Sequence, residues 1–190
     1  SSDLNTSNLR VAARNMKRAR TVQTIEAEPQ PLPTGPWRVI VADPPWQYDK
    51  RDEDGSHRGT VDYPRMSIEE MCALEVPSIA HEDAILWLWT TNAHFQQAYQ
   101  VVDAWGFQPK TVLTWVKSTM GLGDWLRGQT EHCIMAVRGR PTVQLTYLTT
   151  ALHAPVREHS RKPDEFYRLV EGLCPGSRVE LFSRTPREGW

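Results

Sequence analysis

Residues 39–49 read VIVADPPWQYD, and this stretch places a rigid corner directly after an apolar run. The run WRVIVA over residues 37–42 has the composition of a buried strand. It stops at Asp43, which two prolines and Trp46 follow. Proline has no backbone N–H to donate to a neighbouring strand, so a buried strand does not continue through two prolines. Each proline also restricts the residue before it, which makes the segment stiff. The stretch therefore predicts a buried strand that ends in a stiff, polar and aromatic corner.

Similar apolar runs alternate with helical patterns along the rest of the chain. Ser67 and Glu70 form a capping box that opens a helix. Asn92 is expected to cap a second helix that ends at Gly106, and Pro163 stands in the first turn of a third. Expected strands cover residues 37–42, 84–90, 111–117, 132–139 and 178–183, with a further candidate at 143–148, and expected helices cover 67–74, 93–105 and 163–173. This alternation predicts an α/β fold with an open, mostly parallel sheet flanked by helices.

The length of 190 residues suits one domain with a sizeable core. The first 35 residues differ in composition, because a basic run (Arg10–Arg20) precedes the proline-rich connector EPQPLPTGP. We therefore expect a basic N-terminal arm and linker over residues 1–35 and the folded domain over 36–190. The arm could contact phosphates, and a solvated helix face is the alternative.

Composition restricts the classes of partner and compartment. A formal net charge of −1 argues against coating nucleic acid by bulk electrostatics. No apolar stretch approaches the roughly 20 residues of a membrane helix, and the N-terminus lacks the apolar core of a secretory signal. Three cysteines do not make a disulfide framework, and the cysteines and six histidines show no metal-binding spacing. We expect a cytoplasmic protein with no metal and no membrane contact.

The corner carries the groups needed to hold a flat ring with an amino substituent. The lone pair of a nucleobase amino group is delocalised into the ring, and two acceptors aimed at its N–H bonds draw the pair back onto nitrogen. Asp43 supplies one acceptor, the carbonyl of Pro44 a second, and Trp46 a surface on which a base can stack. The alternative is that the prolines form a stiff turn and Asp43 only caps it.

Loops that follow strands are the places to search for a site, because ligands of open α/β sheets bind beyond the carboxyl ends of the strands. Long polar and aromatic loops follow the expected strands at residues 43–67, 117–131, 149–162 and 184–190. The first contains basic side chains suited to phosphates: Lys50, Arg51, His57 and Arg58. Acidic neighbours offset this charge, and a solvated loop is the alternative.

Six segments, in chain order, resemble the MT-A (seventy-kilodalton subunit) family of adenine N6-methyltransferases. They are VIVADPPW, YPRMSIEEM, ILWLWTTN, TWVKSTMGLGDWLRGQTEHC, HSRKPDEFYRLVE and PGSRVELFSR. The resemblance covers residues 37–189, nearly the whole expected domain. It implies a Rossmann-like class I methyltransferase fold, S-adenosylmethionine as methyl donor, and transfer to the 6-amino group of adenine. Residues 36–190 would then form the methyltransferase domain.

The resemblance also assigns roles to single residues. The catalytic positions are Asp43, Pro44, Pro45 and Trp46. The cofactor positions are Asp43, Ser160, Lys162, Glu180, Phe182 and Arg184. A cationic Lys162 facing the carboxylate of the donor's amino-acid part is physically reasonable. The expected substrate side combines aromatic and basic residues: Trp46, Tyr48, Tyr63, Lys50, Arg51, His57 and Arg58.

Two departures from the family pattern concern the cofactor. Some relatives continue from the position of Arg184 into Pro-His-Asn, whereas this chain reads TPREGW, which affects part of the expected ribose contact. The sequence also stops at Trp190, where the family usually continues into a Trp-Gly-Asn element that helps to close over the cofactor.

The resulting expectation is an S-adenosylmethionine-dependent methyltransferase acting on adenine in DNA. An RNA adenine methyltransferase is the alternative, and a catalytically silent nucleic-acid-binding subunit is the alternative from another class. DNA is preferred because the chain looks nearer the compact bacterial and phage members. A homodimer or a related partner subunit is expected to supply further nucleic-acid surface. A carboxylate of Asp43 held in a buried ion pair and turned away from the cleft would contradict this mechanism.

Overall fold

The computed structural model describes residues 31–47, 65–121, 125–144, 147–157, 161–183 and 186–190. Its strands are β1 (Trp37–Ala42), β2 (Ala80–Thr90), β3 (Gln108–Lys117), β4 (Thr130–Arg138), β5 (Ala151–Ala154) and β6 (Arg178–Leu181). Its helices are α2 (Ile68–Cys72), α3 (Val76–Ile79), α4 (Phe95–Ala104), α5 (Asp164–Leu173) and the short 3-10 helix η1 (Asn92–His94). The expected arm over residues 1–35 lies outside this part except for 31–35, so the domain boundaries stay a prediction.

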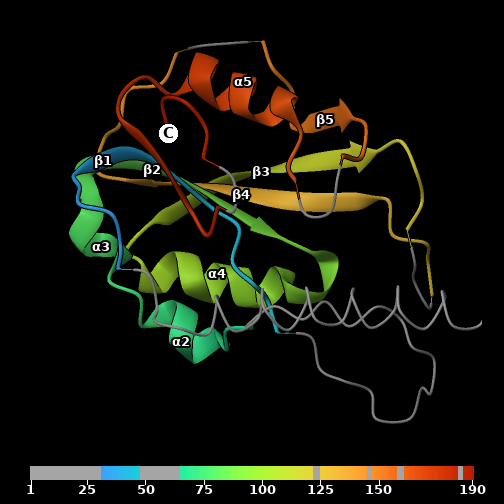
Figure 1. Cartoon of the computed structure of the whole chain (residues 1–190), viewed down its shortest axis with the longest axis horizontal. Helices are drawn as coiled ribbons and strands as arrows, with labels where there is room; N and C mark the ends of the chain where they lie inside the picture. The colour runs from blue at the N-terminus through green and yellow to red at the C-terminus, as the bar shows by residue number, and fades with distance from the viewer. Residues whose placement is uncertain (1–30, 48–64, 122–124, 145–146, 158–160, 184–185) are drawn as a thin grey trace, which may run out of the picture.

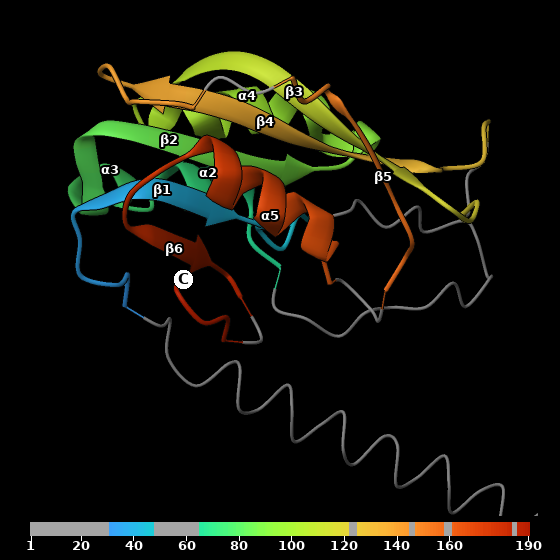
Figure 2. The same ribbon diagram turned by 90° about the horizontal axis from the view of Figure 1, so that it is seen from above.

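A six-stranded sheet in the order β5-β3-β4-β2-β1-β6 organises the described residues. Parallel pairs join β1 to β2, β1 to β6 and β3 to β5, whereas β4 is antiparallel to both β2 and β3. Figure 2 shows the arrowhead of β4 pointing against those of β1, β2 and β6. The prediction of a mostly parallel α/β sheet is confirmed. The reversed β4 begins at the edge where its neighbours end.

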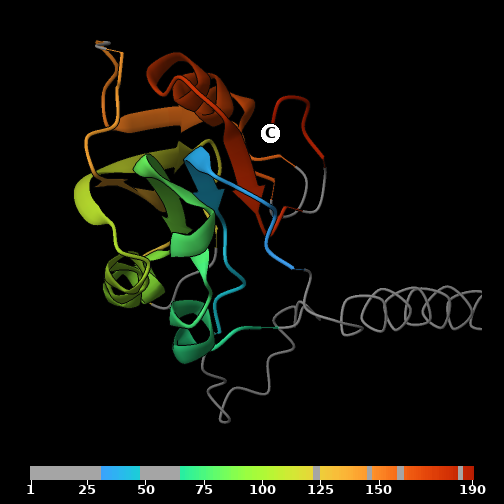
Figure 3. The same cartoon turned by 90° about the vertical axis from the view of Figure 1, so that its left-hand side faces the viewer.

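Helices cover both faces of the sheet, with α5 on one side and α4 and α2 on the other (Figures 1 and 3). Alternate residues of β1 supply the two cores: Ile40 packs toward α4, and Val41 packs toward α5. In β2, Leu88 belongs to the α4-side core and Trp89 to the α5-side core. Because both faces are covered, β1 and β2 read as continuous apolar runs and not as alternating ones.

The helix starts follow from local hydrogen bonds. The predicted capping box is present: the Ser67 hydroxyl accepts from Glu70 N–H at 3.2 Å, and Glu70 accepts from Ser67 N–H at 2.7 Å. Pro163 is the N-cap of α5, one position before the first turn. Gly106 follows α4 with φ of 74°, a conformation that glycine adopts without strain.

The prediction that Asn92 caps the second helix is wrong. Asn92 opens η1, the long helix α4 begins at Phe95, and neither has a side-chain cap bond. The reason is a competing partner, since the Asn92 carboxamide oxygen accepts a hydrogen bond from His132 Nε2 at 2.7 Å. The tertiary contact with β4 overrides the local capping preference.

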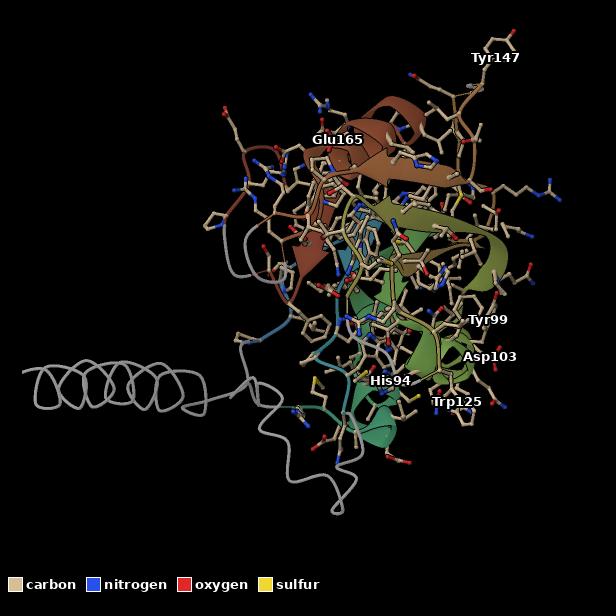
Figure 4. All side chains as sticks on the ribbon, turned by 90° about the vertical axis from the view of Figure 1, so that its right-hand side faces the viewer. His94, Tyr99, Asp103, Trp125, Tyr147 and Glu165 are labelled. Carbon is tan, nitrogen blue, oxygen red and sulfur yellow. The ribbon has the colours of Figure 1, made fainter. Side chains whose placement is uncertain are left out.

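The candidate strand at residues 143–148 is also wrong where the chain is described. Residues 143, 144, 147 and 148 lie outside any strand, and the edge strand β5 is formed by Ala151–Ala154. Tyr147 and Leu148 are exposed, and Figure 4 shows Tyr147 projecting away from the body of the protein. The described apolar residues Val143, Tyr147 and Leu148 therefore follow a strand-like pattern without being buried. In the described part of the chain no helix is long and apolar enough to cross a membrane.

Candidate active site

The corner after β1 is held by its own backbone. The Trp46 N–H donates to the Pro44 carbonyl at 2.9 Å, which closes a tight turn across Pro45. The Pro45 carbonyl accepts from the Met66 N–H at 3.0 Å, and this bond ties the corner to the chain that enters α2. A carbonyl oxygen has two lone pairs, so Pro44 can accept a second hydrogen bond from a ligand. The expected rigidity of the two prolines is therefore reinforced by hydrogen bonds on both sides.

Beyond the end of β1, the corner passes from the α5 side of the sheet to the α4 side. Asp43 lies on the α5 side, where it meets Lys162, whereas Trp46 is part of the α4-side core and only 6% exposed. The Trp46 indole N–H donates to the Trp89 carbonyl at 3.0 Å, and its ring stacks on His94 with centroids 5.5 Å apart. Trp46 thus anchors the corner in the core. Its expected role as a stacking surface for a base stays a prediction, and this burial opposes it.

A chain of alternating charges begins at Asp43. The Lys162 ammonium lies 3.1 Å from Asp43 Oδ2 and 2.8 Å from Glu131 Oε2. Glu131 Oε1 lies 2.5 Å from the Lys117 ammonium. Lys162 also stands over the ring of Trp89 at 4.7 Å from its centroid, so the ammonium is enclosed by carboxylates and an aromatic face. Asp43, Lys162, Glu131 and Lys117, which we call the charge quartet, are formally neutral together.

The side chains of the charge quartet differ in exposure. The Lys162 side chain is 9% exposed, that of Glu131 20% and that of Asp43 29%. Asp43 is therefore in an ion pair, yet it is the carboxylate with the larger contact with solvent. Asp43 is thus ion-paired but only partly buried, and its catalytic role stays a prediction.

The charges within the quartet fix its protonation states. Burial by itself raises the pKa of Glu131, but Lys162 and Lys117 outweigh it and hold that pKa below its ordinary value. Burial by itself lowers the pKa of Lys162, but Asp43 and Glu131 outweigh it and raise that pKa above its ordinary value. Glu131 is therefore a carboxylate and Lys162 an ammonium at neutral pH.

Glu180 approaches the same edge from β6. It pairs in register with Val41 of β1, two residues before Asp43, and its carboxylate accepts a hydrogen bond from the Tyr167 hydroxyl at 2.7 Å. Burial raises the pKa of Glu180, and the charge of Asp43 adds to that shift. Burial makes the charged form of this carboxylate unfavourable, so a ligand that donates hydrogen bonds to it would stabilise that form.

The C-terminal segment packs beside this carboxylate. The Arg187 guanidinium lies over the Tyr167 ring, 3.8 Å from its centroid, and donates to Asp164 at 2.6 Å. The Trp190 indole N–H donates to Glu171 at 2.8 Å. The residues TPREGW that depart from the family pattern therefore bring a cation next to Tyr167 and Glu180.

Phe182 directly follows β6 and has φ of 66°. This left-handed conformation is unusual for an aromatic residue and costs about 1–3 kcal/mol, so the surrounding packing must hold it. Eight other predicted site residues lie outside the described part of the chain: Tyr48, Lys50, Arg51, His57, Arg58, Tyr63, Ser160 and Arg184. Their assignments stay predictions.

The structure brings together three predicted residues (Asp43, Lys162 and Glu180) and adds two that sequence reasoning missed. Glu131 is the last residue of the expected loop 117–131, but no motif distinguishes it from the other polar residues there, and only the reversed strand β4 brings it to Lys162. Tyr167 was missed because it reads as an ordinary apolar position of α5. Within the described residues, no group of three or more His, Cys, Asp or Glu side chains is placed to hold a metal ion.

Comparison with known proteins gives a consistent assignment. The profile described as MT-A70 matches residues 37–190. The "N(6)-adenosine-methyltransferase MT-A70-like" of Arabidopsis thaliana is 33% identical over 167 residues, covering 82% of this chain and 23% of that protein. The "N(6)-adenosine-methyltransferase catalytic subunit METTL3" of Homo sapiens is 32% identical over 160 residues, covering 79% of this chain and 26% of that protein. This chain thus spans about a quarter of the length of these relatives.

A shorter relative is matched over most of its length. The "Type II methyltransferase M.MunI" of Mycoplasma sp is 32% identical over 188 residues, covering 87% of this chain and 79% of that protein. MT-A70 proteins are class I methyltransferases that use S-adenosylmethionine as the methyl donor, and the α/β sheet found here agrees with that fold. Since the profile extends from β1 to the last residue, this chain belongs to the MT-A70 family.

Proposed function

We propose that this protein transfers a methyl group from S-adenosylmethionine to the 6-amino group of adenine in DNA, at the corner formed by Asp43 and Pro44. The observation that carries the proposal is the position of Asp43. It is a partly exposed carboxylate at the carboxyl end of β1, next to a proline carbonyl and beside the acidic Glu180 of β6. This is the edge at which α/β sheets bind their ligands.

The two acceptors suit an exocyclic amino group. Asp43 accepts a hydrogen bond from one N–H and the Pro44 carbonyl from the other, which favours a lone pair localised on nitrogen. When bound, S-adenosylmethionine would supply an electrophilic methyl group to this lone pair. Asp43 would then accept the proton that the methylated nitrogen loses.

The residues around the corner also fit the donor. A sulfonium cation is favoured by negative charge, which Asp43, Glu131 and Glu180 supply together. The amino-acid carboxylate of the donor needs a cation, and Lys162 is a buried ammonium within this group. The ribose hydroxyls need an acceptor, and Glu180 carries one at the end of β6.

The ion pair between Asp43 and Lys162 is compatible with catalysis. Glu131 is a second partner for Lys162 at 2.8 Å, so the ammonium keeps a counter-charge when Asp43 turns toward an amino group.

Asp43→Asn tests the catalytic assignment. We expect transfer of labelled methyl groups to fall roughly 10²–10³-fold, because one acceptor becomes an amide that can present a donor to the amino group. The melting temperature should change little, since Asp43 is partly exposed and the buried Lys162 keeps Glu131 as its counter-charge. Asp103→Asn on the exposed surface of α4 (Figure 4) is the matched control and should transfer at the wild-type rate. Retained activity in Asp43→Asn would count against the mechanism.

DNA is preferred over RNA as the acceptor. The alignment with the type II methyltransferase M.MunI extends over 188 residues, against 167 and 160 for the two adenosine-methyltransferases. In duplex DNA the target base must leave the stack, so single-stranded or mismatched adenine should react faster. Matched single- and double-stranded DNA and RNA oligonucleotides, assayed for transfer with labelled donor, separate the two polymers. Binding without transfer on every oligonucleotide would favour a silent subunit.

A further inference from the structure

A histidine outside the charge quartet holds the far end of the corner. His94 is only 7% exposed and lies inside the fold, just before α4 (Figure 4). Its ring is nearly parallel to that of Trp46, with an interplanar angle of 19°. Its Nε2 atom lies 2.8 Å from the carbonyl oxygen of Gln47, the residue that follows the corner. His94 therefore contacts both residues through which the chain leaves Pro44 and Pro45.

The hydrogen-bond partners of His94 define which ring nitrogen donates and which accepts. A carbonyl can only accept, so Nε2 carries the proton that reaches Gln47. Nδ1 lies 3.2 Å from the Thr91 hydroxyl and accepts from it in the neutral ring. Thr91 precedes η1 and His94 is its last residue, so the ring orientation is set by the segment that follows β2. The segment after β2 thus holds the corner that follows the neighbouring strand β1.

The position of the Pro44 carbonyl depends on this contact. The Trp46 N–H donates to that carbonyl, and Trp46 is itself held by its indole bond to the Trp89 carbonyl and is followed in the chain by Gln47. The Trp46 ring and the Gln47 carbonyl both contact His94. A shift of about 1 Å in a reacting group can cost a large part of the rate without loss of binding.

We propose that His94 is a positioning residue for methyl transfer, which holds the Pro44 carbonyl in line with Asp43 through Gln47 and Trp46. The inference rests on the proposed function. Its distinctive prediction is a split between turnover and donor binding, because His94 lies on the α4 side of the sheet and the charge quartet on the α5 side. A residue that only supports the fold would change both together.

Two substitutions separate the parts of the contact. His94→Phe keeps an aromatic ring on Trp46 but removes the donor to Gln47, whereas His94→Gln keeps an N–H donor at about the position of Nε2. We expect His94→Phe to lower kcat at least tenfold, with the Kd for S-adenosylmethionine by calorimetry within threefold of wild type and the melting temperature within a few degrees. His94→Gln should recover kcat to within about threefold of wild type. His153→Phe, at an exposed position of the edge strand β5, is the control and should match wild type.

The inference is overturned by a wild-type kcat in His94→Phe. It is also overturned if both variants lose turnover, donor affinity and thermal stability in parallel, which is the behaviour of a structural residue. Failure of the proposed function is distinguishable, because the wild-type protein itself would then transfer no methyl group to any oligonucleotide. In that case the assignment of His94 fails with it.

Discussion

Replacing Lys162 by methionine removes the ammonium that joins Asp43 to Glu131 and keeps most of the apolar stem. Lys162 is buried, and its two ion-pair distances are 3.1 and 2.8 Å. At an effective dielectric constant of about 20, each contact corresponds to roughly 5 kcal/mol of Coulomb energy, which the desolvation of the ions largely offsets. Removing one partner of such a pair costs about 3–5 kcal/mol, because the remaining charge stays buried and uncompensated. We expect Lys162→Met to lower the free energy of unfolding by about this amount at pH 8.

The pH dependence of this loss has a defined sign. In the wild-type protein the pKa of Glu131 lies below its ordinary value, so its stabilising effect is present above pH 4.5 and is lost as the pH falls through the lowered pKa. In Lys162→Met, Glu131 stays buried but loses the first of the charges that hold its pKa down, so its pKa in the folded state rises, and protonation relieves the cost of the buried charge as the pH falls. The difference in stability between the two proteins should therefore shrink between pH 8 and pH 5.

Urea unfolding followed by circular dichroism at both pH values measures the effect. Lys110→Met, at an exposed position of β3, is the control and should change stability by less than about 0.5 kcal/mol. Adding Glu131→Gln to Lys162→Met should restore part of the loss, because it removes one of the two like charges. Equal stability of Lys162→Met and wild type at pH 8, or a difference that grows toward pH 5, would refute the reasoning.

Two further expectations concern Glu180 and two glycines. Glu180→Gln should raise the melting temperature at pH 8, because it removes a buried carboxylate whose pKa is held above its ordinary value. The same substitution should weaken S-adenosylmethionine binding, measured by calorimetry, roughly tenfold. Unchanged affinity would exclude Glu180 from the cofactor site. Gly139→Ala should lower the free energy of unfolding by about 2–3 kcal/mol. Gly139 has φ of 64°, and a Cβ atom there would meet the Glu82 carbonyl at 2.3 Å. Gly172→Ala in α5 meets nothing within 4 Å and should stabilise by about 0.5–1 kcal/mol, so similar urea midpoints for the two variants would contradict this account.

Local patterns in the sequence were sufficient for much of the fold. The apolar run before Asp43, the capping box of Ser67 and Glu70, and the glycine after α4 each involve residues within a few positions of one another. The structure confirms all three. Asn92 was assigned wrongly because its partner, His132, lies 40 positions away, and no local pattern reveals such a competitor.

The site was less accessible to sequence reasoning. Proximity of Asp43, Lys162 and Glu180 was expected only through a family resemblance and the rule that sites follow strands. Glu131 falls within the expected loop 117–131, yet its contact with Lys162 depends on the reversal of β4, which the apolar pattern of that strand does not reveal. Trp46 shows a further limit of sequence-based prediction. The sequence does not distinguish an aromatic ring that stacks on a bound base from one that packs in the core, and Trp46 is buried.

The reversal of β4 has a consequence for how this architecture can diversify. A parallel neighbour would have returned through a crossover helix, whereas the antiparallel pair β3 and β4 is joined by one hairpin that opens at the ligand edge. Insertions there need not disturb any helix or the register of the other strands. The length of this one connection can therefore change while the strands that carry the charge quartet keep their pairing.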